Sequence, residues 1–454
     1  MDLTDLIKEG IHSVAIVGAS PKKGKIGNVI LTNLMRYGFK GRVYLVNPKY
    51  KEVLGIKCWS SVSELPEAPD MAVIAVPPKA VIKVISELSR VGCKLAVIIT
   101  SGFKEAGKEN LENELISRAG PYLRIVGPNS AGIFLSKLRL YASIEVIVSS
   151  GKVGIATQSG AVGGAISYIL SKLSSGPSFM ISLGNMCDVD INEVLRYALQ
   201  DDDTEAVIAY IEWLRSGKEF MINAKELSKR KPLVVIKGGW GEVSSEAILS
   251  HTGGFSGSYE VFLGAMKQCG AYVASDLQEA CEVTEVLRRI KSIRGNRVLV
   301  VTNSGGLGIL AVSHLEHEGA SLHKPPKELL KELVSVVGKE PTGRNPLDFG
   351  GDSRLIDLLK VAGIDELKRT YDLLLFLYVP TALDTKESIC RDFRSVSEVS
   401  IPTVVYYEGG WKEEVIKCIS SKLPVVTSIN NMTKAFKALQ SRAKFLRRYS
   451  LNTE

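Results

Sequence analysis

Short apolar runs alternate with segments of helical periodicity along almost the whole chain, and this alternation restricts the fold more than any other feature. Strands buried on both faces of a parallel sheet form continuous apolar runs, and amphipathic helices between them cover the sheet. The pattern predicts an α/β protein with doubly wound open sheets. We expect strands at Ser13–Val17, Val43–Val46, Met71–Val76, Leu95–Ile99, Arg124–Val126, Val153–Thr157, Phe179–Leu183, Ala206–Ile211, Leu233–Lys237, Val298–Thr302, Leu373–Val379 and Thr403–Tyr407.

The chain of 454 residues divides into three blocks of such runs. A chain of this length is typical of roughly three domains, at about 150 residues each. The second block begins near Gly127-Pro128-Asn129, and the third follows the charged stretch Leu287–Asn296. We predict three consecutive open-sheet domains, over residues 1–127, 128–292 and 293–454.

Charge and cysteine content argue against several classes of protein, among them nucleic-acid-binding and disulfide-rich proteins. The net charge is +8, but the one dense basic segment, Lys434–Arg448, has the apolar spacing of a solvated helix rather than of a nucleic-acid surface. The seven cysteines are dispersed, which argues against a disulfide framework and a zinc site. No secretion signal is evident, and the longest apolar run is too short to span a membrane. We expect a cytoplasmic protein that binds neither nucleic acid nor membranes.

His251 is the candidate nucleophile. It is one of five histidines and lies in the glycine-rich segment Ser250-His-Thr-Gly-Gly-Phe-Ser-Gly257. A neutral imidazole is nucleophilic near pH 7 and can accept a phosphoryl group. The local sequence leaves a second interpretation open, a turn histidine that is hydrogen-bonded to nearby backbone. His314 and His317 have helical spacing without a third ligand, so we predict no metal site.

The loop after the first predicted strand, Gly18–Gly27, is rich in glycine and lysine. Its backbone N–H groups and the following helix N-terminus can bind a phosphate. The loop is not Gly-x-Gly-x-x-Gly, and the next strand ends in Asn47 rather than in the acid that holds the ribose of NAD. Lys22, Lys23 and Lys25 suit a nucleotide with an additional phosphate, such as coenzyme A (CoA). A Rossmann-like domain kept only for packing is the alternative.

Two further strand ends have residues suited to phosphate chemistry. Ser159 and Gly160, in the segment Thr157–Gly164, would present a hydroxyl and free N–H groups at a positive helix end, although such turns also serve packing alone. Glu212 ends another predicted strand. A carboxylate there can hold an imidazole in one tautomer, and a salt-bridged loop glutamate is the alternative.

Taken in order, several segments resemble the nucleoside-diphosphate-forming acyl-CoA synthetases, the succinyl-CoA synthetase superfamily, and within it the α subunits of the ADP-forming acetate–CoA ligases. The resemblance covers essentially the whole chain and implies a Rossmann-like CoA-binding domain followed by two flavodoxin-like domains. The segments are Val17-Gly-Ala-Ser20, Val126-Gly-Pro-Asn-Ser-Ala-Gly132, Thr157-Gln-Ser-Gly160, Ser250-His-Thr-Gly253, Thr302-Asn-Ser-Gly-Gly306 and Asn345-Pro-Leu-Asp348.

The resemblance also implies roles for single residues. His251 would be transiently phosphorylated and Glu212 would steady it. The helix N-terminus that receives the phosphate would include Thr157, Ser159 and Gly160. Lys22 and Lys25 compete with Lys23 for the CoA loop, and Phe255, beside the histidine, is bulkier than the family pattern. CoA would be bound by Gly18, Ser20, Lys23, Val76 and Pro77, with Asn129 and Ser130 near its thioester.

The activity that the resemblance implies is the reversible conversion of acetyl-CoA, ADP and phosphate into acetate, ATP and CoA, through acetyl phosphate and a phosphohistidine. The sequence has no region that resembles an ATP-grasp domain. A separate ATP-grasp β subunit is therefore expected to bind ADP or ATP and Mg²⁺, in an α2β2 heterotetramer.

Two alternatives remain open: the same chemistry on a branched-chain, aryl or succinyl group, and a non-catalytic CoA-binding regulatory protein. An NAD-dependent dehydrogenase is disfavoured by Asn47.

Overall fold

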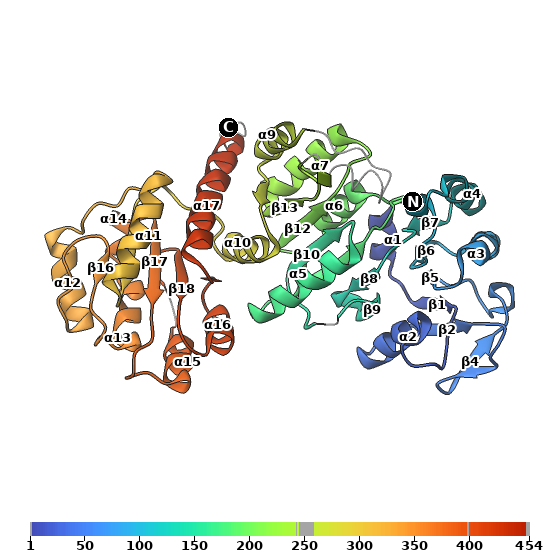
Figure 1. The fold of residues 1–454 in the computed structure, drawn as a ribbon, viewed down its shortest axis with the longest axis horizontal. Coiled ribbons are helices and arrows are strands. Elements are labelled where there is room, and N and C mark those ends of the chain that lie inside the picture. Colours follow the sequence, from blue (N-terminus) through green and yellow to red (C-terminus); the bar gives the residue numbers. More distant parts are fainter. Residues whose placement is uncertain (1, 147, 242, 245–257, 397–398, 451–454) are drawn as a thin grey trace. The chain divides into compact units, whose positions relative to one another are not determined.

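The computed structural model contains three β-sheets with helices packed against them (Figure 1). It describes residues 2–146, 148–241, 243–244, 258–396 and 399–450. The predicted α/β class is confirmed. Each strand that the apolar pattern predicts is present, and the ends differ from the predicted ends by at most two residues.

The first sheet has the strand order β3-β4-β2-β1-β5-β6-β7. Its central strand β1 pairs in parallel with β2 and β5, so the turn after β1 lies at the carboxyl edge where open α/β sheets bind ligands. The elements of this part are α1 (Leu3–Glu9), β1 (Ser13–Val17), α2 (Ile26–Arg36), β2 (Arg42–Val46), β3 (Glu52–Val53), β4 (Ile56–Trp59), β5 (Met71–Ile74), α3 (Pro78–Val91), β6 (Leu95–Ile98), α4 (Glu109–Ala119) and β7 (Arg124–Val126).

Alternate residues of β1 enter different cores, because successive side chains of a strand point to opposite faces. Val14 and Ile16 pack in the core that includes α1 and α2. Ala15 and Val17 pack in the core that includes α3 and α4. All four side chains are buried, which explains why β1 is a continuous apolar run in the sequence.

The second sheet has the order β14-β13-β12-β10-β11-β8-β9. Its five parallel strands follow the flavodoxin-like order, and the antiparallel hairpin β8–β9 extends one edge. The elements are β8 (Gly132–Leu135), β9 (Leu140–Ser143), β10 (Val153–Thr157), α5 (Gly160–Lys172), β11 (Pro177–Ser182), α6 (Ile191–Gln200), β12 (Ala206–Ile211), α7 (Gly217–Arg230), β13 (Leu233–Lys237), α9 (Tyr259–Cys269) and β14 (Tyr272–Ala274).

The third sheet has the order β16-β15-β17-β18-β19 and is parallel throughout, which is again the flavodoxin-like order. Its elements, with the helix that precedes it, are α10 (Leu277–Arg289), β15 (Val298–Thr302), α11 (Gly305–His317), α12 (Lys327–Val337), β16 (Leu347–Asp348), α13 (Leu355–Leu359), α14 (Leu367–Thr370), β17 (Leu373–Tyr378), α15 (Lys386–Ser395), β18 (Thr403–Tyr407), α16 (Lys412–Ser420), β19 (Val425–Val426) and α17 (Ile429–Ser450).

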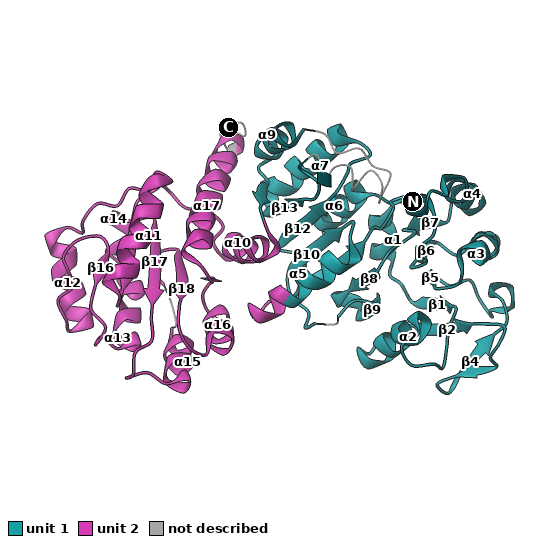
Figure 2. Ribbon diagram, in the orientation of Figure 1, with its two compact units in different colours: residues 1–168, 176–275 teal, residues 169–175, 276–454 magenta. Residues whose placement is uncertain are grey.

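The chain divides into two compact units (Figure 2). Residues 1–168 and 176–275 form the first unit, and residues 169–175 and 276–454 form the second. The first two sheets share one unit because a single hydrophobic core runs from α1 and α2 into β10, β11 and β12. The three-domain division predicted from the sequence stays a prediction.

One expectation about the cysteines is corrected. Cys390 and Cys418 form a disulfide, although they are 28 positions apart in the sequence. Their helices, α15 and α16, pack against each other, and sequence spacing does not report such proximity. The other five cysteines are free thiols.

Within the ranges that the structure describes, no helix is long and apolar enough to cross a membrane. Those same ranges contain no cluster of three or more His, Cys, Asp or Glu side chains arranged to hold a metal ion.

Candidate functional site: two neighbouring sheet edges

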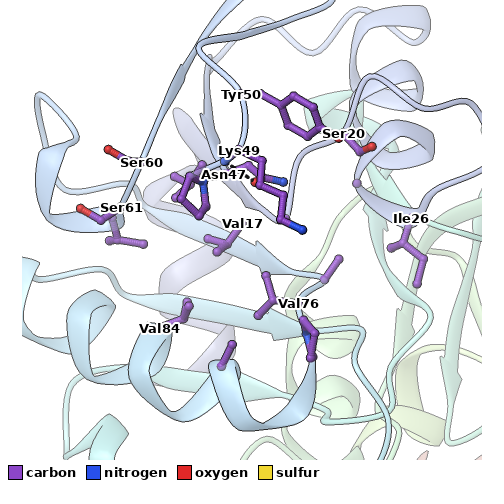
Figure 3. A pocket seen from close by; sticks show the side chains of 18 of the residues that line it. Val17, Ser20, Ile26, Asn47, Lys49, Tyr50, Ser60, Ser61, Val76 and Val84 are labelled. Carbon is purple, nitrogen blue, oxygen red and sulfur yellow. Dashed lines mark hydrogen bonds between the residues drawn. The ribbon is translucent and has the colours of Figure 1, made fainter.

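A cavity of about 630 Å³ opens at the carboxyl edge of the first sheet (Figure 3). Valine side chains from β1, β2, α3 and the loop after β5 contribute to its apolar wall, and hydroxyl groups and lysines are distributed around it. Glu87 is the one acidic residue among the lining residues. Such a cavity suits a ligand with both an apolar part and several negative charges. The lining includes Val17, Val46, Val76 and Val84 in the wall, with Ser20, Ser60, Ser61, Lys22, Lys25, Lys49 and Lys83 around it.

The turn after β1 brings backbone close to this cavity. Gly18 has φ +98°, and a Cβ there would overlap the carbonyl oxygen of Ala75. The Asn47 side chain donates a hydrogen bond to the carbonyl oxygen of Ala19 at 2.7 Å, so it holds the turn in place. This contact gives Asn47 a structural reason to stand where a dinucleotide-binding strand has an acid.

Four of the residues predicted to bind CoA line the cavity: Gly18, Ser20, Val76 and Pro77. Lys23 is not among the lining residues, whereas Lys22 and Lys25 are. The sequence does not show which of these three lysines faces the ligand, because all three lie within one short turn.

Asn129 and Ser130, predicted to lie near the thioester, belong to the loop after β7 and do not line the cavity. The hydroxyl of Ser130 donates to the carbonyl oxygen of Ser182 at 2.6 Å and accepts from the N–H of Gly132 at 2.9 Å. Ser130 is buried, and its two hydrogen bonds link the loop to the second sheet. Asn129 has φ +59°, and its N–H donates to the carbonyl oxygen of Thr100 at 2.9 Å.

The turn between β10 and α5 is stabilised by Thr157. Its hydroxyl accepts a hydrogen bond from the N–H of Ser159 at 3.1 Å and donates to the Ser159 carbonyl at 2.6 Å. Thr157 is fully buried, and α5 begins at Gly160. The free N–H groups of the first turn of α5 give this end of the helix a partial positive charge, which favours an anion.

Glu145 also lies beside this turn, and the sequence did not predict it as a site residue. A Cβ added to Gly160 or Gly164 would meet its carboxylate oxygens. Burial raises the pKa of Glu145. No local motif marks this residue, because the contact depends on how the segment after β9 crosses α5.

Glu212 follows β12, which pairs directly with β10, so it stands next to the Thr157–Gly160 turn. It is 8% exposed. The ammonium group of Lys237, on the other neighbouring strand β13, donates a hydrogen bond to the backbone carbonyl of Glu212 at 2.8 Å. Burial lowers the pKa of Lys237 to about 8, although the charge of Glu212 opposes this shift.

Tyr210 completes the group around Glu212. Burial, together with the charge of Glu212 and a hydrogen bond to it, raises the pKa of the Tyr210 phenol to about 12. Neither Tyr210 nor Lys237 is a residue that the sequence predicted for the site. Their positions at the ends of predicted neighbouring strands were the available signal.

His251 lies outside the described residues, in the segment between β13 and α9. Its chain neighbours on both sides, β13 and α9, belong to the unit that carries Glu212 and the Thr157–Gly160 turn. The proposed contact between His251 and Glu212 therefore stays a prediction.

Two family models match the chain. Residues 12–136 match a CoA binding domain, and residues 150–287 match a succinyl-CoA ligase like flavodoxin domain. The first match contains the cavity of the first sheet. The second contains the Thr157–Gly160 turn, Glu212 and the segment with His251.

Curated proteins and solved structures agree with these matches. The α subunit of acetate–CoA ligase [ADP-forming] II from Pyrococcus furiosus is 33% identical over 95% of this chain and 96% of its own length. Acetate–CoA ligase [ADP-forming] I from Archaeoglobus fulgidus is 37% identical over 81% of this chain. The chain spans about half of that relative, 54% of its length.

A solved structure resembles the whole chain. The dinucleotide-forming acetyl-coenzyme A synthetase 1 of Ca. Korarchaeum cryptofilum, in complex with phosphate and ADP, is 34% identical and superposes with a TM-score of 0.90. The match covers 99% of both chains.

Proposed function

Because this chain belongs to the family of ADP-forming acetate–CoA ligases, we propose that it interconverts acetyl-CoA, ADP and phosphate with acetate, ATP and CoA. The observation that carries the proposal is that the Thr157–Gly160 turn, where helix α5 begins, lies next to a buried carboxylate, Glu212, at the ends of the paired strands β10 and β12. A phosphoryl group and a histidine that carries it need these two groups side by side.

In the first step, an oxygen of inorganic phosphate attacks the acyl carbon of acetyl-CoA. The carbon–sulfur bond breaks, and the thiolate leaves with the proton of the phosphate, giving acetyl phosphate and CoA. The cavity of the first sheet would hold CoA, with Lys22 and Lys25 near its phosphates and Val76 and Pro77 along its path. The α5 N-terminus would hold the phosphate that reacts.

In the second step, an imidazole nitrogen of His251 attacks the phosphorus of acetyl phosphate. The phosphorus–oxygen bond breaks, and acetate leaves. Glu212 would orient the imidazole and stabilise the positive charge that forms on it. In the third step, a β-phosphate oxygen of ADP attacks the phosphohistidine, and the phosphorus–nitrogen bond breaks to give ATP.

We further propose an ATP-grasp partner subunit that binds ADP and Mg²⁺ for the third step, in an α2β2 assembly. The name of the Pyrococcus furiosus relative, a subunit alpha, supports a partner chain. The same chemistry on a different acyl group is one alternative, and profiling the acyl-CoA substrates decides it.

The test is to incubate the purified chain with acetyl-CoA and radiolabelled phosphate, and to locate an acid-labile, base-stable label by peptide mass spectrometry. Label on His251 that is lost in His251→Asn supports the proposal. If the chain alone stays unlabelled, the experiment is repeated with an ATP-grasp subunit. A second blank, with CoA still bound, would leave a CoA-binding regulatory protein.

A further inference from the structure

Gln158 makes a set of hydrogen bonds to the backbone that carries Glu212. Its side-chain oxygen accepts from the N–H groups of both Glu212 and Trp213, the latter at 3.1 Å. Its side-chain nitrogen donates to the carbonyl oxygen of Trp213 at 2.7 Å. Gln158 is 5% exposed, so its side chain forms its hydrogen bonds within the protein rather than with solvent.

The geometry explains why a glutamine suits this position. β10 and β12 pair in parallel up to Thr157 and Tyr210, and Gln158 directly follows β10. Its carboxamide presents an acceptor oxygen and a donor nitrogen, as a peptide group does, and it continues the hydrogen-bond ladder onto Glu212 and Trp213. Lys237 binds the carbonyl oxygen of Glu212 from β13, so both neighbouring strands hold this backbone.

We propose that Gln158 is a positioning residue for phosphoryl transfer: it holds the Glu212 backbone, and with it the carboxylate, next to the Thr157–Gly160 turn. This inference rests on the proposed function. Gln158 touches neither substrate nor phosphate in this scheme and acts only through Glu212.

In the third sheet, a side-chain amide binds neighbouring backbone in the same way, but that backbone does not carry a glutamate. Asn303 follows β15 as Gln158 follows β10, and its side-chain nitrogen donates to the carbonyl oxygen of Val379 at 2.7 Å. Its side-chain oxygen accepts from the N–H of Val379 at 3.0 Å. The threonine turn is repeated as well, since the Thr302 hydroxyl accepts from the N–H of Ser304 at 2.9 Å. We call this pair of hydrogen bonds from a side-chain amide to the neighbouring backbone a clamp. Asn303→Ala therefore removes an equivalent clamp at a site that does not contact Glu212.

The experiment compares Gln158→Ala, Asn303→Ala, Glu212→Gln and the double variant Gln158→Ala/Glu212→Gln in the full chain, with the partner subunit if labelling needs it. The rate at which His251 is labelled from acetyl-CoA and radiolabelled phosphate is measured. We expect Gln158→Ala to label about 10- to 100-fold more slowly, as variants that release an orienting contact do. Asn303→Ala should label at the wild-type rate, and calorimetry should find CoA affinity unchanged in both.

The double variant separates positioning from a general loss of structure. If Gln158 acts only through Glu212, the double variant labels as slowly as Glu212→Gln alone. Wild-type labelling by Gln158→Ala, or independent effects in the double variant, would overturn the inference. Should Gln158→Ala fail to fold, Gln158→Glu keeps the acceptor and loses the donor. Its labelling should then recover as the pH falls and the new carboxyl group is protonated, and a flat pH profile would count against the clamp.

Amide hydrogen exchange distinguishes failure of this inference from failure of the proposed function. An unlabelled wild-type complex contradicts the proposed function. The clamp is still tested, because Gln158→Ala should speed exchange at the N–H groups of Glu212 and Trp213, and Asn303→Ala should speed it at Val379. Unchanged exchange at Glu212 and Trp213 would show that Gln158 does not hold them.

Discussion

At the scale of single residues, the lysines of the first turn differ by position. Lys22 and Lys25 line the cavity and Lys23 does not. We expect Lys22→Ala or Lys25→Ala to weaken CoA binding by about 1.5–3 kcal/mol, since a hydrogen bond to a charged phosphate contributes that much. Isothermal calorimetry with CoA measures this, and Lys23→Ala is the matched control.

Dephospho-CoA, which lacks the 3′-phosphate, identifies the group that is bound. A lysine that contacts the 3′-phosphate should lose its effect with this ligand. Equal losses in the Lys23→Ala variant and in the other two would contradict the assignment from the cavity.

Lys237 gives a prediction about pH. Burial lowers its pKa from 10.5 to about 8, so between these values the folded protein binds fewer protons than the unfolded chain does. This group therefore makes the free energy of unfolding rise with pH across that window. Lys237→Met should remove its contribution, and urea denaturation at a series of pH values from 7 to 10.5 measures the change.

The control for Lys237 is Lys229→Met, which removes a lysine from the surface of α7. The prediction is wrong if both variants show the same slope.

At the scale of elements, the junction of β1 and α2 depends on close approach of backbone. Gly18 and Gly24 both have positive φ, +98° and +83°, but only at Gly18 would a Cβ meet another atom. Gly24→Ala should cost about 1–2 kcal/mol through backbone strain alone. Gly18→Ala should cost about 1–3 kcal/mol more through overlap with Ala75, and it should also weaken CoA binding.

Chemical denaturation and CoA calorimetry on the two alanine variants check this prediction. A Gly18→Ala protein that is as stable as Gly24→Ala would show that the turn can move away from Ala75.

At the scale of the whole molecule, Arg124 ties the first two sheets together. It lies at the start of β7 and binds Asp188 at 2.9 Å and Glu193 at 2.7 Å, both in the second sheet's part of the chain. Arg124→Ala leaves two carboxylates without this cation, so we expect a loss of about 3–5 kcal/mol. Arg118→Ala, which breaks an exposed pair with Glu114, should cost less than about 1 kcal/mol.

Thermal and urea denaturation of both arginine variants measure the difference. A small loss for Arg124→Ala would mean that the shared hydrophobic core alone joins the two sheets.

The elements that the sequence predicted and those that it missed differ in a physical way. Central parallel strands such as β1 and β10 are buried on both faces and therefore form continuous apolar runs. The hairpin β8–β9 and the short strands β3, β16 and β19 lack a sufficiently long run, and their pairing depends on distant partners. The same limit applies to Cys390 and Cys418, which no local spacing brings together.

The sequence by itself determined the α/β class, because burial patterns are local properties of the chain. The resemblance carried by its short glycine-rich segments indicated the family and the candidate residues His251, Glu212 and Ser159. Only the tertiary structure decided that Lys22 and Lys25 face the cavity, that Gln158 and Lys237 hold Glu212, and that Arg124 joins two sheets. Those contacts join strand ends that are far apart in the sequence. Which backbone group a polar side chain there can bind depends on which strands are neighbours in the sheet.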